Sequence, residues 1–239
     1  MIGGDYDGLY PAGLLDTDAS AALLSRLAEE QGDKSLLELG IGTGRLALAL
    51  LDQGFEVAGI EGSESMLAAF REKPRSEEIE VALGDFAQVD LERKFSIVAL
   101  VFNTIFGLLS QETQISCFRN AARHLRPGGV FVVEAYVLQP DQLSADWKVS
   151  PRTIHHEQVE LQLSRYDAAE QTLERVMVHL REEGTRLLTV KDRYAWPGEL
   201  DAMALIAGLP LKARYSNWEE APFTSSSRKH VSVYELPGT

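Results

Sequence analysis

The residues with the clearest chemical meaning lie in the first quarter of the chain, where acids and glycines alternate with apolar residues. The run over residues 35–46 reads SLLELGIGTGRL, and a second apolar run ends in Glu61. The first run contains an acid, Glu38, and then turns through three alternating glycines, Gly40, Gly42 and Gly44. Glycine lets a ligand approach bare backbone, and the helix that follows directs its N–H groups at that ligand. The pattern predicts a strand, a turn and a helix that bind a nucleotide-like molecule.

Two classes of ligand compete for this turn. A dinucleotide fold has the spacing G-x-G-x-x-G, which seats a pyrophosphate on the helix N-terminus. Here Arg45 stands where the third glycine would be, and Glu38 would repel a pyrophosphate. An acid at this position suits a ligand with a positive charge and an ammonium group. The residues therefore favour a cationic ligand over a dinucleotide. The alternative is a dinucleotide site, as in an NAD-dependent oxidoreductase.

The segment ELGIGTG over residues 38–44 resembles motif I of the class I methyltransferases that use S-adenosylmethionine (SAM), written E/D-x-G-x-G-x-G. The match to that pattern is complete. The resemblance implies in-line transfer of the methyl group from the sulfonium to a nucleophile, with S-adenosylhomocysteine as the product. It also implies a set of cofactor-binding residues, most of them at strand ends: Tyr10, Glu38, Gly40, Gly42, Gly44, Arg45, Glu61, Gly62, Ser63, Met66, Gly84, Asp85, Phe86, Phe102, Asn103 and Thr104.

Each later strand end has its own expected contact with SAM. A carboxylate at Glu61 can accept hydrogen bonds from both ribose hydroxyls. In the family, an acid such as Asp85 accepts the adenine amino group, and the segment at Asn103 faces the methyl group. The chain has Asn-Thr-Ile-Phe from Asn103, without the two prolines of the enzymes that methylate exocyclic amines of DNA. That activity is therefore disfavoured.

The resemblance extends to the bacterial methyltransferases of natural-product pathways, including the aminosugar N,N-dimethyltransferases. It covers nearly the whole chain, from the lead-in DYDGLY at residues 5–10 to HVSVYE at residues 230–235, and includes HLRPGG at residues 124–129. These enzymes also insert an antiparallel layer after strand five. The motifs specify SAM and leave N-, O- and C-methylation open.

The periodicity predicts an α/β fold with a doubly wound, seven-stranded, mostly parallel sheet and a small antiparallel β insertion after strand five. We expect parallel strands over residues 35–39, 56–60, 79–83, 95–102 and 130–137, and closing strands over 211–218 and 230–236. Helices are expected over 16–31, 43–53, 63–73, 111–125 and 196–207. The insertion is expected to contain three strands, Glu157–Tyr166, Thr172–Arg181 and Leu187–Tyr194.

This pattern divides the chain into a SAM-binding core, 1–137 plus 195–239, and an inserted substrate cap, 138–194. The expected catalytic or positioning residues in the cap are Tyr194, His155 and His156, with His179, Glu134 and Tyr136 as further candidates for a base. Adjacent histidines on a strand face opposite sides, so at most one of His155 and His156 would point into a cleft. A base is optional, because an amine acceptor needs only to be neutral.

Composition restricts the partners. The 239 residues carry a formal net charge of −13, which repels polyanions such as DNA and RNA and favours a small-molecule substrate. No apolar run reaches the length of a membrane span, and no signal-like N-terminus precedes the single cysteine, Cys117, so we expect a cytoplasmic protein. The sequence indicates no metal site and leaves a homodimer open. Besides a methyltransferase and an oxidoreductase, a non-catalytic SAM-binding module fits the motifs.

Overall fold

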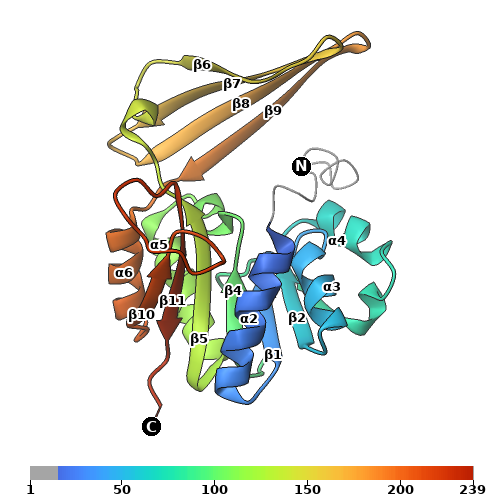
Figure 1. Cartoon of the computed structure of the whole chain (residues 1–239), viewed down its shortest axis with the longest axis vertical. Coiled ribbons are helices and arrows are strands. Elements are labelled where there is room, and N and C mark those ends of the chain that lie inside the picture. The colour runs from blue at the N-terminus through green and yellow to red at the C-terminus, as the bar shows by residue number, and fades with distance from the viewer. Residues whose placement is uncertain (1–15, 239) are drawn as a thin grey trace.

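The computed structural model describes residues 16–238 as two sheets, a large one flanked by helices and a smaller one that projects from it (Figure 1). Tyr10 and the segment at residues 5–10 lie outside the described residues. The expected roles of Tyr10 therefore stay predictions.

The large sheet has seven strands in the order β10-β11-β5-β4-β1-β2-β3. Strands β1 to β5 pair in parallel, whereas β11 is antiparallel to both β5 and β10. The strands are β1 (Ser35–Leu39), β2 (Glu56–Glu61), β3 (Glu80–Leu83), β4 (Phe95–Leu100), β5 (Leu125–Tyr136), β10 (Leu211–Tyr215) and β11 (Lys229–Glu235). This arrangement confirms the predicted doubly wound, mostly parallel sheet.

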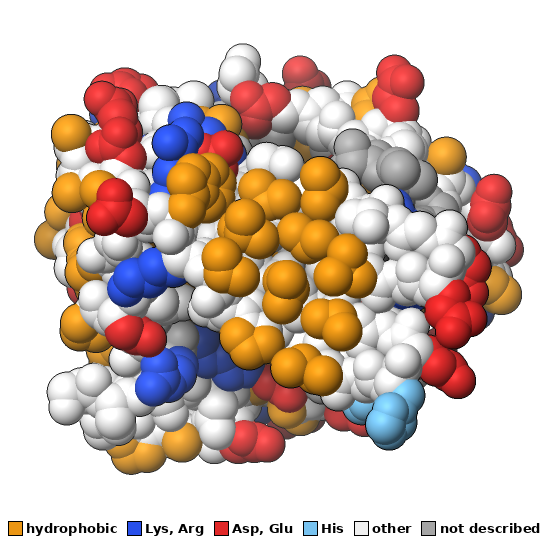
Figure 2. Space-filling model, turned by 90° about the horizontal axis from the view of Figure 1, so that it is seen from above, with side chains coloured by type: hydrophobic (Ala, Val, Ile, Leu, Met, Phe, Trp, Pro, Cys, Tyr) orange, Lys and Arg blue, Asp and Glu red, His pale blue; other side chains and the backbone are white. Residues whose placement is uncertain are grey.

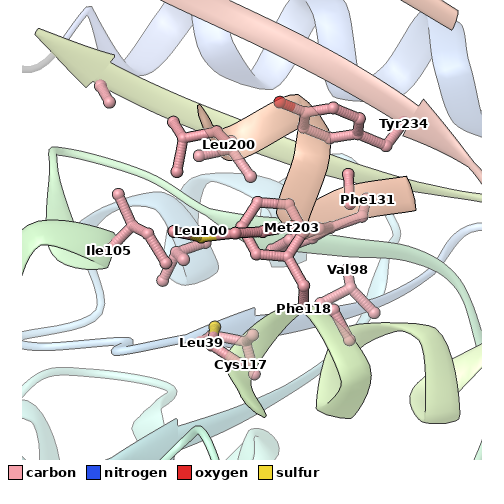
Figure 3. Close-up of a cluster of buried hydrophobic side chains, with 14 of the residues drawn as sticks. Leu39, Val98, Leu100, Ile105, Cys117, Phe118, Phe131, Leu200, Met203 and Tyr234 are labelled. Atoms are coloured by element: carbon pink, nitrogen blue, oxygen red, sulfur yellow. The ribbon is translucent and has the colours of Figure 1, made fainter. Parts of the chain in front are cut away.

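Helices cover both faces of this sheet. They are α2 (Thr17–Gln31), α3 (Arg45–Asp52), α4 (Glu64–Arg71), α5 (Gln111–His124) and α6 (Pro197–Ile206), with short 3-10 turns η3 (Ser76–Glu78), η4 (Thr104–Gly107) and η5 (Pro140–Gln142). All residues of β1 and β4 are buried, as expected for central parallel strands. Two apolar clusters result, one on each face. Figure 3 shows the cluster under α5 and α6, where Phe118, Phe131 and Tyr234 meet.

The second sheet contains four antiparallel strands in the order β6-β7-β8-β9. They are β6 (Lys148–Ile154), β7 (Gln158–Asp167), β8 (Thr172–Arg181) and β9 (Gly184–Arg193). The sequence predicted only three strands here and missed β6. This strand is exposed at the edge of the sheet and contains Pro151, a residue that edge strands tolerate because one side of them needs no hydrogen bonds.

Three buried contacts fix the small sheet on the body of the protein. Leu173 is buried in the cluster under α5 and α6. The Tyr136 hydroxyl donates to Asp192 at 3.0 Å, and the Leu138 N–H donates to the Tyr194 hydroxyl at 3.1 Å. The segment between Leu138 and Tyr194 thus leaves the large sheet and returns to it at one place.

Two strand boundaries differ from the expected ones for local reasons. Strand β4 ends at Leu100, before the expected residue 102, because Phe102 and Asn103 adopt positive φ angles of 55° and 65°. Strand β5 begins at Leu125, before the expected residue 130. We expected a turn at Arg126–Gly129. These residues instead form a bulge inside β5, between Leu125, which pairs with Phe95 of β4, and Val130, which pairs with Ile97.

Candidate functional site

The glycine turn joins β1 to α3 at the carboxyl edge of the large sheet. Gly40, Gly42 and Gly44 have φ angles of 69°, 60° and 76°, a region that other residues rarely adopt. A Cβ at Gly44 would lie 2.3 Å from the ring of Phe70, and one at Gly40 would lie 2.7 Å from Thr104. Side chains would therefore disrupt both the turn and its packing.

Glu38 sits beneath this turn and is 3% exposed. Its burial raises the pKa of the carboxyl group to about 8, a hydrogen bond from the Ala47 N–H opposes that rise, and the charge of Glu61 adds to it. Its Oε2 atom is buried and has no hydrogen-bond partner among the described residues. A buried carboxyl oxygen without a partner is costly, and a bound cation or hydrogen-bond donor would remove that cost.

Glu61, at the end of β2, connects the turn to the next helix. One carboxylate oxygen accepts the Gly42 N–H and the other accepts the Ser63 N–H, both at 2.8 Å. The residue is 8% exposed. Each oxygen keeps a second lone pair, so the carboxylate can orient the backbone and still accept from a ligand hydroxyl.

Ser63 caps α4, since its hydroxyl accepts the Met66 N–H. The Cε atom of Met66 lies 3.3 Å from the position that a Cβ would occupy at Gly42. Across the β2–β3 edge, the Gly84 N–H donates to the Glu61 carbonyl at 2.8 Å, and a Cβ on Gly62 would lie 3.6 Å from the Gly84 carbonyl oxygen. The segments after β2 and β3 therefore lie side by side.

Asp85 is exposed, and its carboxylate accepts the Ala87 N–H at 2.9 Å and the Gln88 side-chain amide at 2.7 Å. The first of these bonds orders the turn after β3. The ring of Phe86 lies 3.8 Å from the position of a Cβ at Gly40, which brings the β3 end next to the glycine turn.

The loop after β4 is held in an unusual conformation by the end of β5. Glu134 accepts the Phe102 N–H with its carboxylate at 3.0 Å and the Asn103 N–H with its backbone carbonyl at 3.1 Å. The Asn103 side chain in turn accepts the Tyr136 N–H at 2.6 Å. Two consecutive residues with positive φ are strained, and such strain persists only where surrounding bonds enforce it.

A pocket with a cavity volume of about 80 Å³ opens at this edge of the sheet. Six of the predicted cofactor residues line it: Glu38, Gly40, Gly42, Arg45, Phe102 and Thr104. Glu61 and Met66 do not line it, but they lie against Gly42, which does, and Ser63 is hydrogen-bonded to both of them. The predicted residues thus form one continuous edge across the ends of β1, β2, β3 and β4.

The pocket also contains residues that the sequence reasoning gave no cofactor role. Glu134 lines it from β5, and Thr17 and Ser20 line it from α2. Trp218 is 3% exposed, and its indole N–H has no hydrogen-bond partner among the described residues. Glu134 was expected only as a candidate base, and no motif marks Thr17, Ser20 or Trp218, which come from segments far apart in the sequence.

Known proteins share both this sequence pattern and this fold. A family model described as a methyltransferase domain matches residues 36–129. Cypemycin N-terminal methyltransferase from a Streptomyces species is 26% identical over 205 residues, which are 84% of this chain and 83% of that protein. The structure of the CcbJ methyltransferase from Streptomyces caelestis has a TM-score of 0.85 and 41% identity, over 92% of this chain and 95% of that one.

The chain belongs to the SAM-dependent methyltransferases. An aminosugar enzyme of Saccharopolyspora spinosa, dTDP-4-amino-2,3,4,6-tetradeoxy-D-glucose N,N-dimethyltransferase, is 32% identical over 63% of this chain and 60% of its own length. The prediction of SAM as cofactor is confirmed, and the alternative of an NAD-dependent oxidoreductase is set aside.

The residues of this methyltransferase fit SAM. The free oxygen of Glu38 matches the ammonium group of the methionine part, and the Glu61 carboxylate has lone pairs for the ribose hydroxyls. SAM supplies an electrophilic methyl group on a sulfonium. We expect the protein to contribute mainly by aligning this donor with the acceptor. These individual residue roles stay predictions.

The expected catalytic residues of the methyltransferase lie apart from the pocket. Tyr194 is fully buried, its ring is stacked on Tyr136 with centroids 5.7 Å apart, and burial raises the pKa of its hydroxyl to about 12. His155 and His156 are exposed between β6 and β7, and the backbone N–H of His155 donates to the backbone carbonyl of Gln158. In this arrangement none of the three lines the pocket, so a catalytic role for them is not supported by their placement.

Among residues 16–238, no group of three or more His, Cys, Asp or Glu side chains is arranged to hold a metal ion. None of the helices described between Thr17 and Ile206 combines the length and apolar character needed to cross a bilayer. Cys117 is buried within α5.

Proposed function

We propose that this methyltransferase acts on an amino group of a small molecule. The observation that carries this proposal is the carboxylate of Glu134, which lines the pocket beside the loop expected to face the methyl group and lies 3.5 Å from the Lys229 ammonium. Carboxylates favour a basic, cationic substrate. The relatives named for N-terminal and aminosugar N-methylation support an amine acceptor as well.

The chemistry of the step is an in-line displacement. The neutral amine attacks the methyl carbon with its lone pair, the carbon–sulfur bond breaks, and SAM becomes S-adenosylhomocysteine. The methylated ammonium then loses its proton to solvent. Among the described residues, the pocket lining includes no His, Tyr, Lys or Cys side chain, and the lining groups that could accept a proton are the carboxylates of Glu38 and Glu134. An amine does not require a base, whereas a hydroxyl acceptor benefits from one.

A direct test uses the purified protein with SAM and matched acceptors. Amino sugars attached to nucleotides and short peptides with a free N-terminus should gain one or two methyl groups, measured by mass spectrometry and by S-adenosylhomocysteine formation. The same acceptors with the amine replaced by a hydroxyl serve as controls. Turnover of the hydroxyl compounds alone would overturn the amine proposal and leave SAM binding intact.

We propose that the segment 138–194 is a substrate cap on a SAM-binding core made of residues 1–137 and 195–239. Its separate sheet and its attachment at Leu138 and Tyr194 support this division. Removal of the cap segment should spare SAM binding and abolish discrimination among acceptors in a variant that still folds.

We also propose that the protein works in the cytoplasm as a homodimer, without nucleic acid or membrane partners. The cofactor supports the location, since cells make SAM in the cytoplasm. The net charge of −13 supports the exclusion of polyanions and anionic lipids. Cell fractionation and gel-shift assays test these statements.

A further inference from the structure

The small sheet has one face toward the body of the protein and one face away from it. In the register of β7, β8 and β9, Tyr166, Leu173 and Asp192 lie directly opposite one another and share a face. That face points to the body, because Leu173 is buried there and Asp192 contacts Tyr136. Residues five positions away along each strand lie on the opposite face, since side chains alternate.

This opposite face, here called the outer face, is apolar. Leu161, Val178 and Leu187 form one row across it. The edge strand adds Val149 and Ile154, which pair with Leu163 and Val159 of β7. Every strand of the small sheet therefore contributes apolar side chains to the outer face.

The outer face is open. Val149, Ile154 and Leu187 are 61%, 70% and 63% exposed. Figure 2, the view from above the small sheet, shows a continuous apolar patch with charged residues around it. Scattered apolar residues on a surface are ordinary, but a continuous patch of this kind marks an interaction site.

The size of the outer face suits a second protein sheet. Four strands at their usual spacing, each up to ten residues long, make a face of roughly 19 Å by 30 Å. Two such faces pressed together would bury about 1,100 Å² in all, close to the lower limit for a specific interface. Two packed sheets keep their strands within about 30° of each other, which a pair of identical faces satisfies.

The charges at the two ends of the outer face complement each other. At the end near the body, Arg165, Glu174 and Lys191 form a row across the outer face, and Glu174 is paired with Arg165 at 2.8 Å. That leaves the charge of Lys191 in excess. At the other end, the turn between β8 and β9 carries the exposed residues Glu182 and Glu183.

We propose that the outer faces of two copies of this chain pack on each other to form a homodimer. A two-fold axis perpendicular to the strands brings the Lys191 end of one copy over the Glu182 and Glu183 end of the other. Each dimer then contains this ion pairing twice, as isologous contacts do. The pairing also fixes the direction of the strands, because the reverse arrangement places like charges together.

The first test is the mass of the full chain in solution, measured by light scattering at several concentrations. Wild type should have twice the chain mass of 26.4 kDa. Leu187→Asp should give the monomer mass. The matched control is Leu205→Asp on α6, because Leu205 is 64% exposed and lies outside the outer face; it should remain a dimer. A wild-type monomer, or a dimer that survives Leu187→Asp, would overturn the proposal.

The second test reverses the end charges. Lys191→Glu should weaken dimerisation at least tenfold at low salt, and adding Glu182→Lys and Glu183→Lys to the same chain should restore it. Tighter dimerisation by Lys191→Glu alone would overturn the antiparallel arrangement. Circular dichroism and thermal melting should show that each variant folds. A wild-type monomer that floats with phosphatidylcholine vesicles would overturn the dimer in favour of a lipid surface.

Discussion

The side-chain oxygen of Asn103 accepts the backbone N–H of Tyr136 at 2.6 Å and so joins the loop after β4 to the end of β5. Asn103 has a φ of 65°, and asparagine adopts this region more readily than most residues do. The family resemblance predicts that the segment at Asn103 faces the methyl group. The structure adds that its side-chain oxygen is already bonded to the backbone, so we expect Asn103 to hold the loop in place.

Asn103→Ala should lower the free energy of unfolding by about 2–4 kcal/mol. The change leaves the Tyr136 N–H without its acceptor, and alanine tolerates a positive φ less well than asparagine does. Urea unfolding measures the change. Asn103→Gly removes only the hydrogen bond and should be milder. Equal losses in the two variants would mean that backbone strain at this position is negligible.

Glu61→Ala should weaken SAM binding by about 1–3 kcal/mol, the range for loss of a charged hydrogen-bond acceptor. The carboxylate holds the Gly42 and Ser63 N–H groups and keeps lone pairs for the ribose. Calorimetry measures the affinity. Glu56→Ala, at the exposed start of the same strand, is the matched control and should bind SAM as wild type does. A folded Glu61→Ala variant with wild-type affinity would remove Glu61 from the site.

SAM binding should release a proton at pH 6.5. Burial raises the pKa of Glu38 to about 8, so its carboxyl is protonated at that pH. The ammonium of SAM favours the ionised form, and its arrival should expel close to one proton per site. Calorimetry in buffers of different ionisation enthalpy counts that proton. Glu38→Gln should release almost none, and equal release by both proteins would show that the ammonium binds elsewhere.

His230 should make the protein sensitive to acid. It is fully buried in β11, and burial lowers the pKa of its ring to about 3, with the Arg214 charge adding to the effect. The unfolded chain takes up a proton near pH 6.5, so the stability from this group is present above that pH and is lost toward pH 3. The slope is up to about 1.4 kcal/mol per pH unit.

His230→Leu should flatten this part of the stability curve, measured by urea unfolding between pH 7 and pH 4. The control is His155→Leu, which removes an exposed histidine at the tip of the small sheet. A wild-type slope in His230→Leu would place the acid sensitivity in other groups.

The cofactor side of the site could be predicted from the sequence because its residues lie at strand ends in a fixed order. Motif spacing defined Gly40 and Gly42, and the position of Glu61 after β2 followed from the next apolar run. The acceptor side could not be predicted in this way. Its place at the end of a strand marked Glu134 as a candidate base, but Trp218 joins it in the pocket only through the tertiary fold, and no local pattern distinguishes Trp218 from core residues.

The inserted segment 138–194 shows the same limit. Alternation predicted β7, β8 and β9, since their apolar residues repeat every second position. It missed β6, where Pro151 and polar neighbours interrupt the pattern. The sequence predicted Tyr194 as a catalytic or positioning residue from its type and its place in the chain. In the structure its ring packs in the core beside Tyr136. Burial of an aromatic residue with a polar end depends on packing that sequence periodicity does not encode.

The hydrogen bond from the Leu138 N–H to the Tyr194 hydroxyl has a consequence for how such enzymes diversify. Both ends of the segment 138–194 meet at this point on the core, beside the contacts that Leu173 and Asp192 make with it. A segment from a relative, grafted between these two residues, should bring its acceptor preference with it. One closed loop would then let evolution exchange the substrate of the enzyme while the methyl donor stays the same.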